Sequence, residues 1–167
     1  NISSDPDILL VEDSNAGYEF FRSVAEHKTW ETISAGGKSN IYKCLKEYEN
    51  KKILVIADGA AFGPEMDRIM NKIKLSINKE IFLPESFEWL ILKADVIKDN
   101  SVKEILDNPE DFIESKDYMS WERFFTALLV EKTKDTYLRY SKSKLNDAYR
   151  NKKIQEKILK EVPEQLL

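Results

Sequence analysis

The sequence contains few of the residues that mark disulfide-bonded, zinc-binding or membrane-spanning proteins. Among its 167 residues there is one cysteine, Cys44, and one histidine, His27. A single thiol cannot form an internal disulfide, so a reducing compartment, the cytoplasm, is expected. One histidine with one cysteine also argues against a zinc site. No apolar run approaches the roughly 20 residues of a membrane span, and the polar opening at residues 1–6 does not resemble a signal peptide.

What the sequence does contain is enough apolar material for a core, together with a heavily charged surface. Hydrophobic residues make up 42% of the chain and charged residues 34%, and the net charge is -4. This balance argues against a protein that binds nucleic acid over its whole surface, but it allows a local basic patch. The length suits one domain with an appendage. Because the chain begins with Asn1 rather than methionine, we expect it to be part of a longer protein.

Strand and helix signals alternate through the first half of the chain. Four segments are predicted as strands, at residues 8–11, 30–34, 52–57 and 80–83, and the first and third of them contain continuous apolar runs. Apolar residues at helical spacing fill the intervals between them. This alternation predicts an α/β fold with a small parallel sheet of about four strands flanked by helices. We place this domain at residues 1–95 and a helical C-terminal segment at residues 96–167.

The second half of the chain is harder to assign. Residues 87–92 suit either a helix or a fifth strand, and residues 121–159 are typical of one or two long helices. Glu85 and Glu88 follow the fourth predicted strand. They either line a cleft at the strand ends or begin a surface helix. The second interpretation is favoured, because a negative charge suits the positive end of a helix dipole.

Acidic and glycine residues stand directly after three of the predicted strands. Glu12 and Asp13 follow the first strand, Gly36, Gly37 and Lys38 follow the second, and Asp58 and Gly59 follow the third. The carboxyl ends of parallel strands meet at one edge of a sheet, and ligands bind there. Carboxylate oxygens are the ligands that Mg²⁺ prefers, usually together with a substrate phosphate. The sequence therefore predicts one acidic, glycine-lined cleft, with Lys38 beside it as a phosphate contact.

Three short motifs resemble the Toprim domain family, which occurs in topoisomerases, bacterial primases and OLD-type nucleases. They are LLVE at residues 9–12, SAGGK at residues 34–38 and IAD at residues 56–58. The family has a glutamate closing its first strand, a glycine closing its second, and Asp-x-Asp-x-x-Gly after its third. The resemblance covers residues 7–92. It implies that Glu12 is the general acid or base and that Asp58 binds the metal. Asp13, beside Glu12, is the further ligand expected in place of the missing family aspartate, with Glu65 and Asp67 of the following helix as the alternatives.

Two positions depart from the family's pattern. Ala60 stands where the second aspartate belongs, and a methyl group cannot bind a metal. Asp13 stands where the family usually has glycine. The expected cofactor is therefore a weakly bound Mg²⁺ or Mn²⁺. The resemblance implies Mg²⁺-dependent phosphodiester cleavage of DNA or RNA, with a non-catalytic module that binds nucleic acid or protein as the alternative. By analogy with the OLD-type proteins, an ATPase domain is expected before Asn1.

A second resemblance is to the response-regulator receiver, whose opening the segment ILLVEDS at residues 8–14 matches. It implies an acidic pair that binds Mg²⁺ and phosphorylation of Asp58. A receiver also needs a hydroxyl residue after its fourth strand and a lysine after its fifth. Ser86 and Lys93 or Lys98 fit those positions poorly, so the receiver remains the weaker alternative.

The region from residue 131 to residue 160 is basic, with ten lysines and arginines against four acidic residues. Tyr137, Tyr140 and Tyr149 are interleaved with them. Basic residues alternating with aromatic ones suit a nucleic-acid backbone with some base stacking. A solvated helix face, or attraction to the acidic first half, explains the pattern equally well. The candidate nucleic-acid contacts are Lys142, Lys144, Arg150, Lys152 and Lys153.

Overall fold

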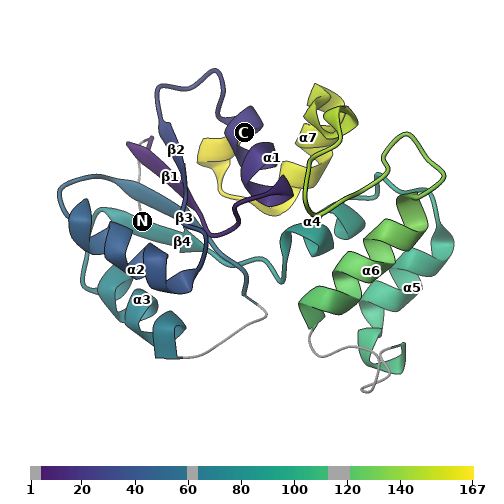
Figure 1. Cartoon of the computed structure of the whole chain (residues 1–167), viewed down its shortest axis with the longest axis horizontal. Helices are drawn as coiled ribbons and strands as arrows, with labels where there is room; N and C mark the ends of the chain where they lie inside the picture. The colour runs from purple at the N-terminus through teal and green to yellow at the C-terminus, as the bar shows by residue number, and fades with distance from the viewer. Residues whose placement is uncertain (1–4, 60–63, 113–120) are drawn as a thin grey trace.

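The computed structural model describes residues 5–59, 64–112 and 121–167. The prediction of an α/β fold is confirmed: four strands form one parallel sheet in the order β2-β1-β3-β4. The strands are β1 (Ile8–Val11), β2 (Glu31–Ser34), β3 (Ile53–Ile56) and β4 (Lys79–Phe82). Between them lie α1 (Ala16–Val24), α2 (Lys38–Glu47) and α3 (Pro64–Lys74). Figure 1 shows α2 and α3 together on one face of the sheet and α1 on the other.

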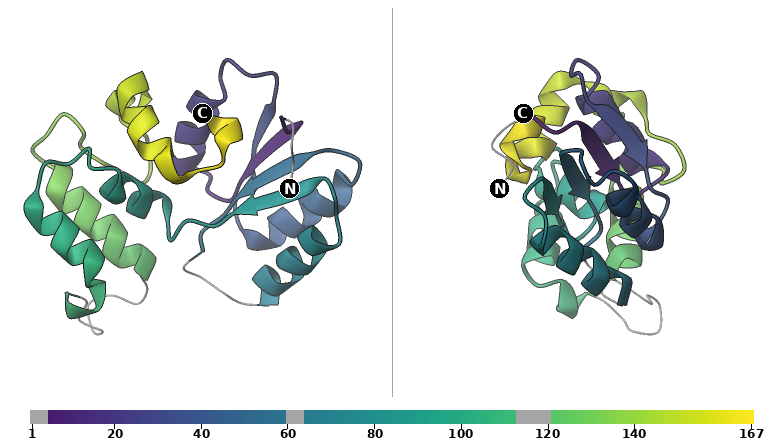
Figure 2. Two further views of the ribbon diagram at one scale, coloured as in Figure 1. Left: turned by 180° about the vertical axis from the view of Figure 1, so that it is seen from behind. Right: turned by 90° about the vertical axis from the view of Figure 1, so that its left-hand side faces the viewer.

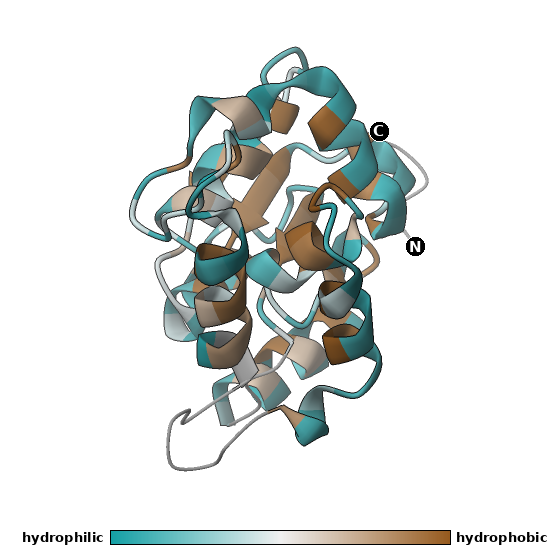
Figure 3. Ribbon diagram, turned by 90° about the vertical axis from the view of Figure 1, so that its right-hand side faces the viewer, coloured by the Kyte–Doolittle hydropathy of each residue, from teal (hydrophilic) through white to brown (hydrophobic). Residues whose placement is uncertain are grey.

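The two faces of the sheet are fixed by the alternation of side chains along the central strands. Leu9 and Val11 pack with α1, through Phe20 and Phe21. Ile8 and Leu10 face the other way, in a second cluster with residues of α2 and α3. Every residue of β1 and β3 is buried, which explains why these two strands are continuous apolar runs. In Figure 3 the brown strands lie inside a shell of helices that are partly teal.

After β4 the chain forms helices in place of a fifth strand. Residues 87–92, which the sequence allowed as either a helix or a fifth strand, belong to the helix α4 (Phe87–Lys93). Ser86 begins it, because its Oγ accepts a hydrogen bond from the backbone N–H of Trp89 at 3.0 Å. Then follow α5 (Asn100–Asp107), a short 3-10 turn η1 (Pro109–Asp111) and α6 (Trp121–Thr133). In Figure 1, α5 and α6 lie side by side on the far side of α4 from the sheet.

The C-terminal region is helical, but the prediction of one or two long helices over residues 121–159 is wrong. Helix α6 ends at Thr133, and the next elements are short: η2 (Asp147–Arg150), α7 (Lys152–Ile158), η3 (Leu159–Glu161) and η4 (Glu164–Leu166). Asn146 and Asn151 start η2 and α7, because their side chains accept hydrogen bonds from backbone N–H groups two residues on. The intervening loop buries Leu138 and Tyr140. Tertiary burial and asparagine caps therefore override helical periodicity here.

The C-terminal elements close the α1 face of the sheet. Tyr149 and Leu166 belong to the same buried cluster as Leu9 and Val11, so the core is continuous across residue 95. Figure 2 shows α7 and the C-terminus against α1, on the opposite side of the sheet from α2 and α3. Oε2 of Glu19 in α1 accepts a hydrogen bond from the N–H of Leu145 at 2.7 Å, which joins α1 to the loop before η2. Within the described ranges, no helix is both long and apolar enough to cross a bilayer.

Candidate functional site

The connections of the sheet reverse direction at β1 and β3. The chain passes from β1 to β2 over one face through α1, then returns across β1 to β3 over the other face through α2. The point between β1 and β3 is therefore the topological switch point, where open parallel sheets bind their ligands. A pocket of about 280 Å³ lies at the carboxyl ends of these strands. Gly59 does not line it, but the other six residues predicted for the cleft do: Glu12, Asp13, Gly36, Gly37, Lys38 and Asp58.

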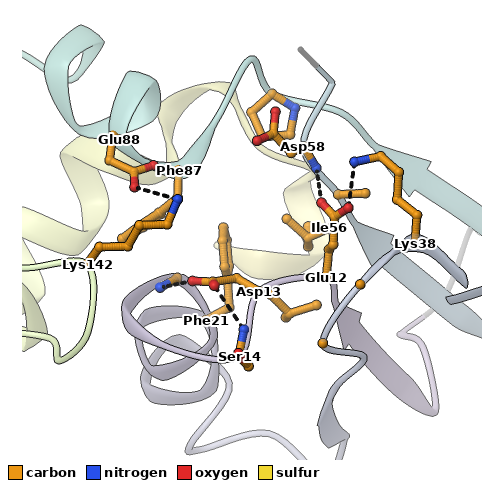
Figure 4. A pocket seen from close by; sticks show the side chains of 16 residues that line it. Glu12, Asp13, Ser14, Phe21, Lys38, Ile56, Asp58, Phe87, Glu88 and Lys142 are labelled. Carbon is orange, nitrogen blue, oxygen red and sulfur yellow. Dashed lines mark hydrogen bonds and ion pairs between the residues drawn. The ribbon is translucent and has the colours of Figure 1, made fainter. Parts of the chain in front are cut away.

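Glu12 is held at the switch point through both of its carboxylate oxygens. Oε1 receives the ammonium of Lys38 at 2.6 Å, and Oε2 accepts a hydrogen bond from the backbone N–H of Asp58 at 2.9 Å. Figure 4 shows the Glu12 carboxylate between these two donors. The Glu12 side chain therefore joins the end of β1 to Asp58, two residues beyond β3, and to Lys38, the first residue of α2. The structure brings together the predicted acid–base residue, one predicted metal ligand and the predicted phosphate contact.

Asp13 has a clear structural task at the start of α1. Its Oδ1 accepts a hydrogen bond from the N–H of Ser14 at 2.9 Å, and its Oδ2 accepts one from the N–H of Gly17 at 2.7 Å. A Cβ at residue 17 would lie 2.7 Å from that same Oδ2, so a side chain there would displace the Asp13 carboxylate from this cap. The aspartate thus caps the first turn of α1 from within the pocket, since helix N-termini leave N–H groups without intrahelical partners.

Gly36 and Gly37 form the turn that brings Lys38 over the pocket. Their φ angles are +72° and +144°, values that L side chains rarely adopt. The N–H of Gly36 donates to the carbonyl of Glu12 at 2.9 Å. Since Lys38 is the first residue of α2, this turn fixes where the lysine enters the pocket. The pair of glycines is therefore a geometric requirement for the contact between Lys38 and Glu12.

Asp58 lies at the end of β3 and is half-buried. The next residue, Gly59, is tightly enclosed: a Cβ there would lie 2.9 Å from the carbonyl oxygen of Leu83. Ala60, the position of the missing family aspartate, lies outside the described residues. In the part of the chain that the structure describes, no group of three acidic, histidine or cysteine side chains is close enough to hold a metal ion.

On the far wall of the pocket, the structure corrects the favoured sequence interpretation of one residue, Glu88. Glu88 was interpreted as a surface residue but is buried, and only 3% of it is exposed. Its Oε1 accepts hydrogen bonds from the hydroxyls of Tyr140 and Thr126, both at 3.1 Å, and lies 3.8 Å from the ammonium of Lys142. Burial raises the pKa of Glu88, although Lys142 and the two hydroxyls oppose that rise. The signal was present in the sequence, since Glu88 precedes Ile91 and Leu92 at helical spacing on the apolar face of α4.

The five basic candidates of the C-terminal segment have different environments. Lys142 alone among them lines the pocket. Arg150 pairs with Asp147 and lines a separate groove beside α1. The other three, which are exposed, are Lys144, Lys152 and Lys153.

The tyrosines interleaved with these basic residues are mostly not available for base stacking. Tyr149 is fully buried and its hydroxyl donates to the carbonyl of Leu138 at 2.5 Å. Tyr140 is also buried, and burial beside the carboxylate of Glu88 raises its pKa. Tyr137 remains largely exposed. Two of the three tyrosines in this segment therefore contribute to core packing.

No protein-family model, no curated protein and no solved structure matches this chain. Its class is therefore defined by the fold and the pocket: an α/β protein with a four-stranded parallel sheet and a charged pocket at the switch point. That pocket contains carboxylates from β1, β3 and α4 and ammonium groups from α2 and the C-terminal loop.

Proposed function

We propose that this chain is a Toprim-like domain that binds a nucleic-acid phosphodiester at the switch-point pocket and cleaves it with the help of a divalent cation. The observation that carries the proposal is that the Glu12 carboxylate contacts both the Lys38 ammonium and the backbone N–H of Asp58. Three separate elements bring these residues together through contacts of 2.6 and 2.9 Å. A general acid or base, a metal-binding carboxylate and a phosphate-binding cation are the groups that such a reaction needs.

Each residue has a role in this proposal. Glu12 either accepts the proton of the attacking water or donates a proton to the leaving oxygen, and Lys38 neutralises a phosphate oxygen. Asp58, with Asp13, supplies carboxylate oxygens to Mg²⁺ or Mn²⁺. Each oxygen of Asp13 accepts one backbone hydrogen bond and keeps a further lone pair. Mg²⁺ commonly binds through one or two carboxylates plus substrate phosphate, so this set fits a weakly held ion that substrate binding completes.

The test is metal-dependent cleavage of supercoiled plasmid and of single-stranded DNA and RNA. We expect nicking in Mg²⁺ or Mn²⁺ that EDTA abolishes. Glu12→Gln should reduce the rate at least about 100-fold, the typical contribution of a general acid or base. The matched control is Glu47→Gln, an exposed carboxylate of α2 away from the pocket. Absence of cleavage by the wild-type protein with both metals, or equal rates in the two variants, would make the catalytic proposal wrong.

A second candidate, a binding module without turnover, is favoured by one specific observation. Both oxygens of Glu12 are already engaged, by Lys38 and by the N–H of Asp58. These two contacts occupy the oxygens that a general acid or base would use for proton transfer. Binding of single-stranded nucleic acid without cleavage in any metal would support this candidate over the nuclease.

The receiver alternative has less support. Ser86, the residue closest to its required hydroxyl, is buried and caps α4. In the described ranges no strand follows Phe82, so a lysine after a fifth strand has no counterpart there. Stable labelling of Asp58 by acetyl phosphate would favour the receiver. A cytoplasmic location is proposed from the single cysteine, and a partner ATPase domain is proposed from the analogy with OLD-type proteins alone.

A further inference from the structure

The far wall of the pocket is built around a buried carboxylate. Glu88 comes from α4, Thr126 from α6, and Tyr140 and Lys142 from the loop before η2. The two hydroxyls donate to Oε1 of Glu88 at 3.1 Å, and the ammonium of Lys142 lies 3.8 Å from the same oxygen. An apolar side chain at this position would avoid the desolvation of a carboxylate, so the fold alone does not require glutamate here.

Lys142 is held at its backbone as well as at its side chain. Its carbonyl accepts a hydrogen bond from the N–H of Ala16, the first residue of α1, at 3.2 Å. Three residues later, the N–H of Leu145 donates to Glu19 of α1. The loop is thus fastened to the helix that begins at the pocket. The Lys142 side chain nevertheless remains 43% exposed, so its charge is accessible from the pocket mouth.

Lys142 and Lys38 face the pocket from different sides. Figure 4 shows Lys142 with Glu88 on one side, Lys38 with Glu12 on the other, and Asp13 between them in this view. Each ammonium is directed by a carboxylate from a different element. Two cations arranged around one pocket suit a ligand that carries more than one phosphate, as a nucleic-acid strand does.

We propose that Lys142 binds a backbone phosphate of the ligand across the pocket from Lys38, and that Glu88 is the positioning residue that directs Lys142 there. This inference rests on the proposed function in one respect, that the ligand is a nucleic-acid strand. It makes the C-terminal loop part of the binding site. It also separates Lys142 from the other basic residues of that segment, which do not line the pocket.

The experiment measures binding of a fluorescently labelled single-stranded DNA oligonucleotide by anisotropy, in EDTA so that cleavage does not intervene. Lys142→Gln should weaken binding about tenfold, and it should lower the slope of log affinity against log salt by roughly 0.7, the value for one phosphate contact on a single strand. The matched control is Lys103→Gln, which removes an exposed charge from α5. Binding by the control should stay within about twofold of wild type, since distant exposed charges are largely screened.

The role of Glu88 is tested by a double-mutant cycle. Glu88→Gln keeps an oxygen that can accept from Tyr140 and Thr126 but removes the charge that directs Lys142. It should weaken binding about fivefold in the wild-type background and have no further effect in Lys142→Gln, because a positioning residue acts only through its partner. Equal losses in both backgrounds would show a general structural effect and overturn the positioning role.

The outcomes also separate this inference from the proposed function. Binding that depends on Lys142, without cleavage in any metal, would support the inference and reject catalysis. If the wild-type protein cleaves nucleic acid but Lys142→Gln binds the oligonucleotide as tightly as Lys103→Gln does, catalysis is supported and the inference is overturned. If the wild-type protein binds no single-stranded DNA, either in EDTA or in Mg²⁺, this inference is wrong, while the plasmid cleavage assay still decides the proposed function.

Discussion

Asp13 shows how one residue can suit a functional motif and yet have a structural task. Both of its carboxylate oxygens accept hydrogen bonds from backbone N–H groups at the start of α1. Its importance for folding can therefore be measured separately from any role in metal binding.

Gly17→Ala tests this cap directly. The added Cβ would lie 2.7 Å from Oδ2 of Asp13, so either the carboxylate or the helix must shift. We expect a loss of about 1–3 kcal/mol in the free energy of unfolding, the usual cost of overpacking a close contact. Urea denaturation measures it. Ser14→Ala is the control, because it keeps the N–H that Asp13 binds. A stability for Gly17→Ala equal to that of the control would contradict the structural role.

Glu88 gives a second prediction at this scale, a dependence of stability on pH. Its pKa is raised above the ordinary 4.5 by burial, so the folded protein holds this proton at pH values where the unfolded chain has lost it. Its contribution to stability is therefore greatest below about pH 4.5 and declines as the pH rises through the raised pKa. Relative to Glu88→Gln, the wild-type protein should lose stability progressively above pH 4.5. Urea midpoints measured from pH 4 to pH 8 provide the check. A difference between the two proteins that stays constant with pH would contradict it.

The sequence predicted which residues share the pocket wall only where those residues directly follow predicted strands. Glu12 and Asp58 follow continuous apolar strands, and Lys38 follows the glycine pair after β2. Parallel topology alone brings such positions to one edge of the sheet. Lys142 and Glu88 meet through the packing of α4 against the C-terminal segment, 54 residues apart in the chain by their numbers. No local pattern encodes a contact of that separation, so only the buried position of an acid on an apolar helix face hinted at it.

At the scale of secondary structure, the sheet was predictable and the C-terminal segment was not. Strands β1 and β3 are continuous apolar runs because both of their faces are covered. By contrast, residues 134–146 have apolar side chains at helical spacing but form a loop, which buries Leu138, Tyr140 and Leu145 against the rest of the core. Asparagines at 146 and 151 are sequence signals for helix starts, and they divide the region into short elements.

Ser86 allows a prediction for one whole helix. Its hydroxyl oxygen caps α4, the helix that carries both Phe87 and Glu88 to the pocket. Ser86→Ala should lower the free energy of unfolding by about 1 kcal/mol, the typical cost of losing such a cap. It should also weaken ligand binding through a displaced Glu88. Ser86→Asp, which can restore the cap, should recover less because residue 86 is buried. Stability of Ser86→Ala equal to wild type would show that the cap is unimportant.

Across the whole molecule, one buried cluster joins the sheet to the C-terminal segment. Leu9 and Val11 of β1 share it with Tyr149 and Leu166, although more than 130 residues separate β1 from either partner. The C-terminal segment also contributes Lys142 to the pocket. Folding of the sheet and completion of the pocket are therefore expected to depend on the same contacts.

Tyr149→Ala tests this dependence at the largest scale. Tyr149 is fully buried, and its hydroxyl donates to the carbonyl of Leu138, so truncation removes both packing and a hydrogen bond. We expect a loss of about 3–5 kcal/mol in the free energy of unfolding, the usual range for large buried aromatic side chains. Because the core is continuous, the opening free energy measured by amide hydrogen exchange should fall by the same amount in β1 and β3 as in the C-terminal helices. The milder variant Tyr149→Phe retains the ring and should cause a smaller loss at both places. Sheet amides that keep wild-type protection in Tyr149→Ala, while α7 exchanges freely, would instead show that the two parts unfold independently.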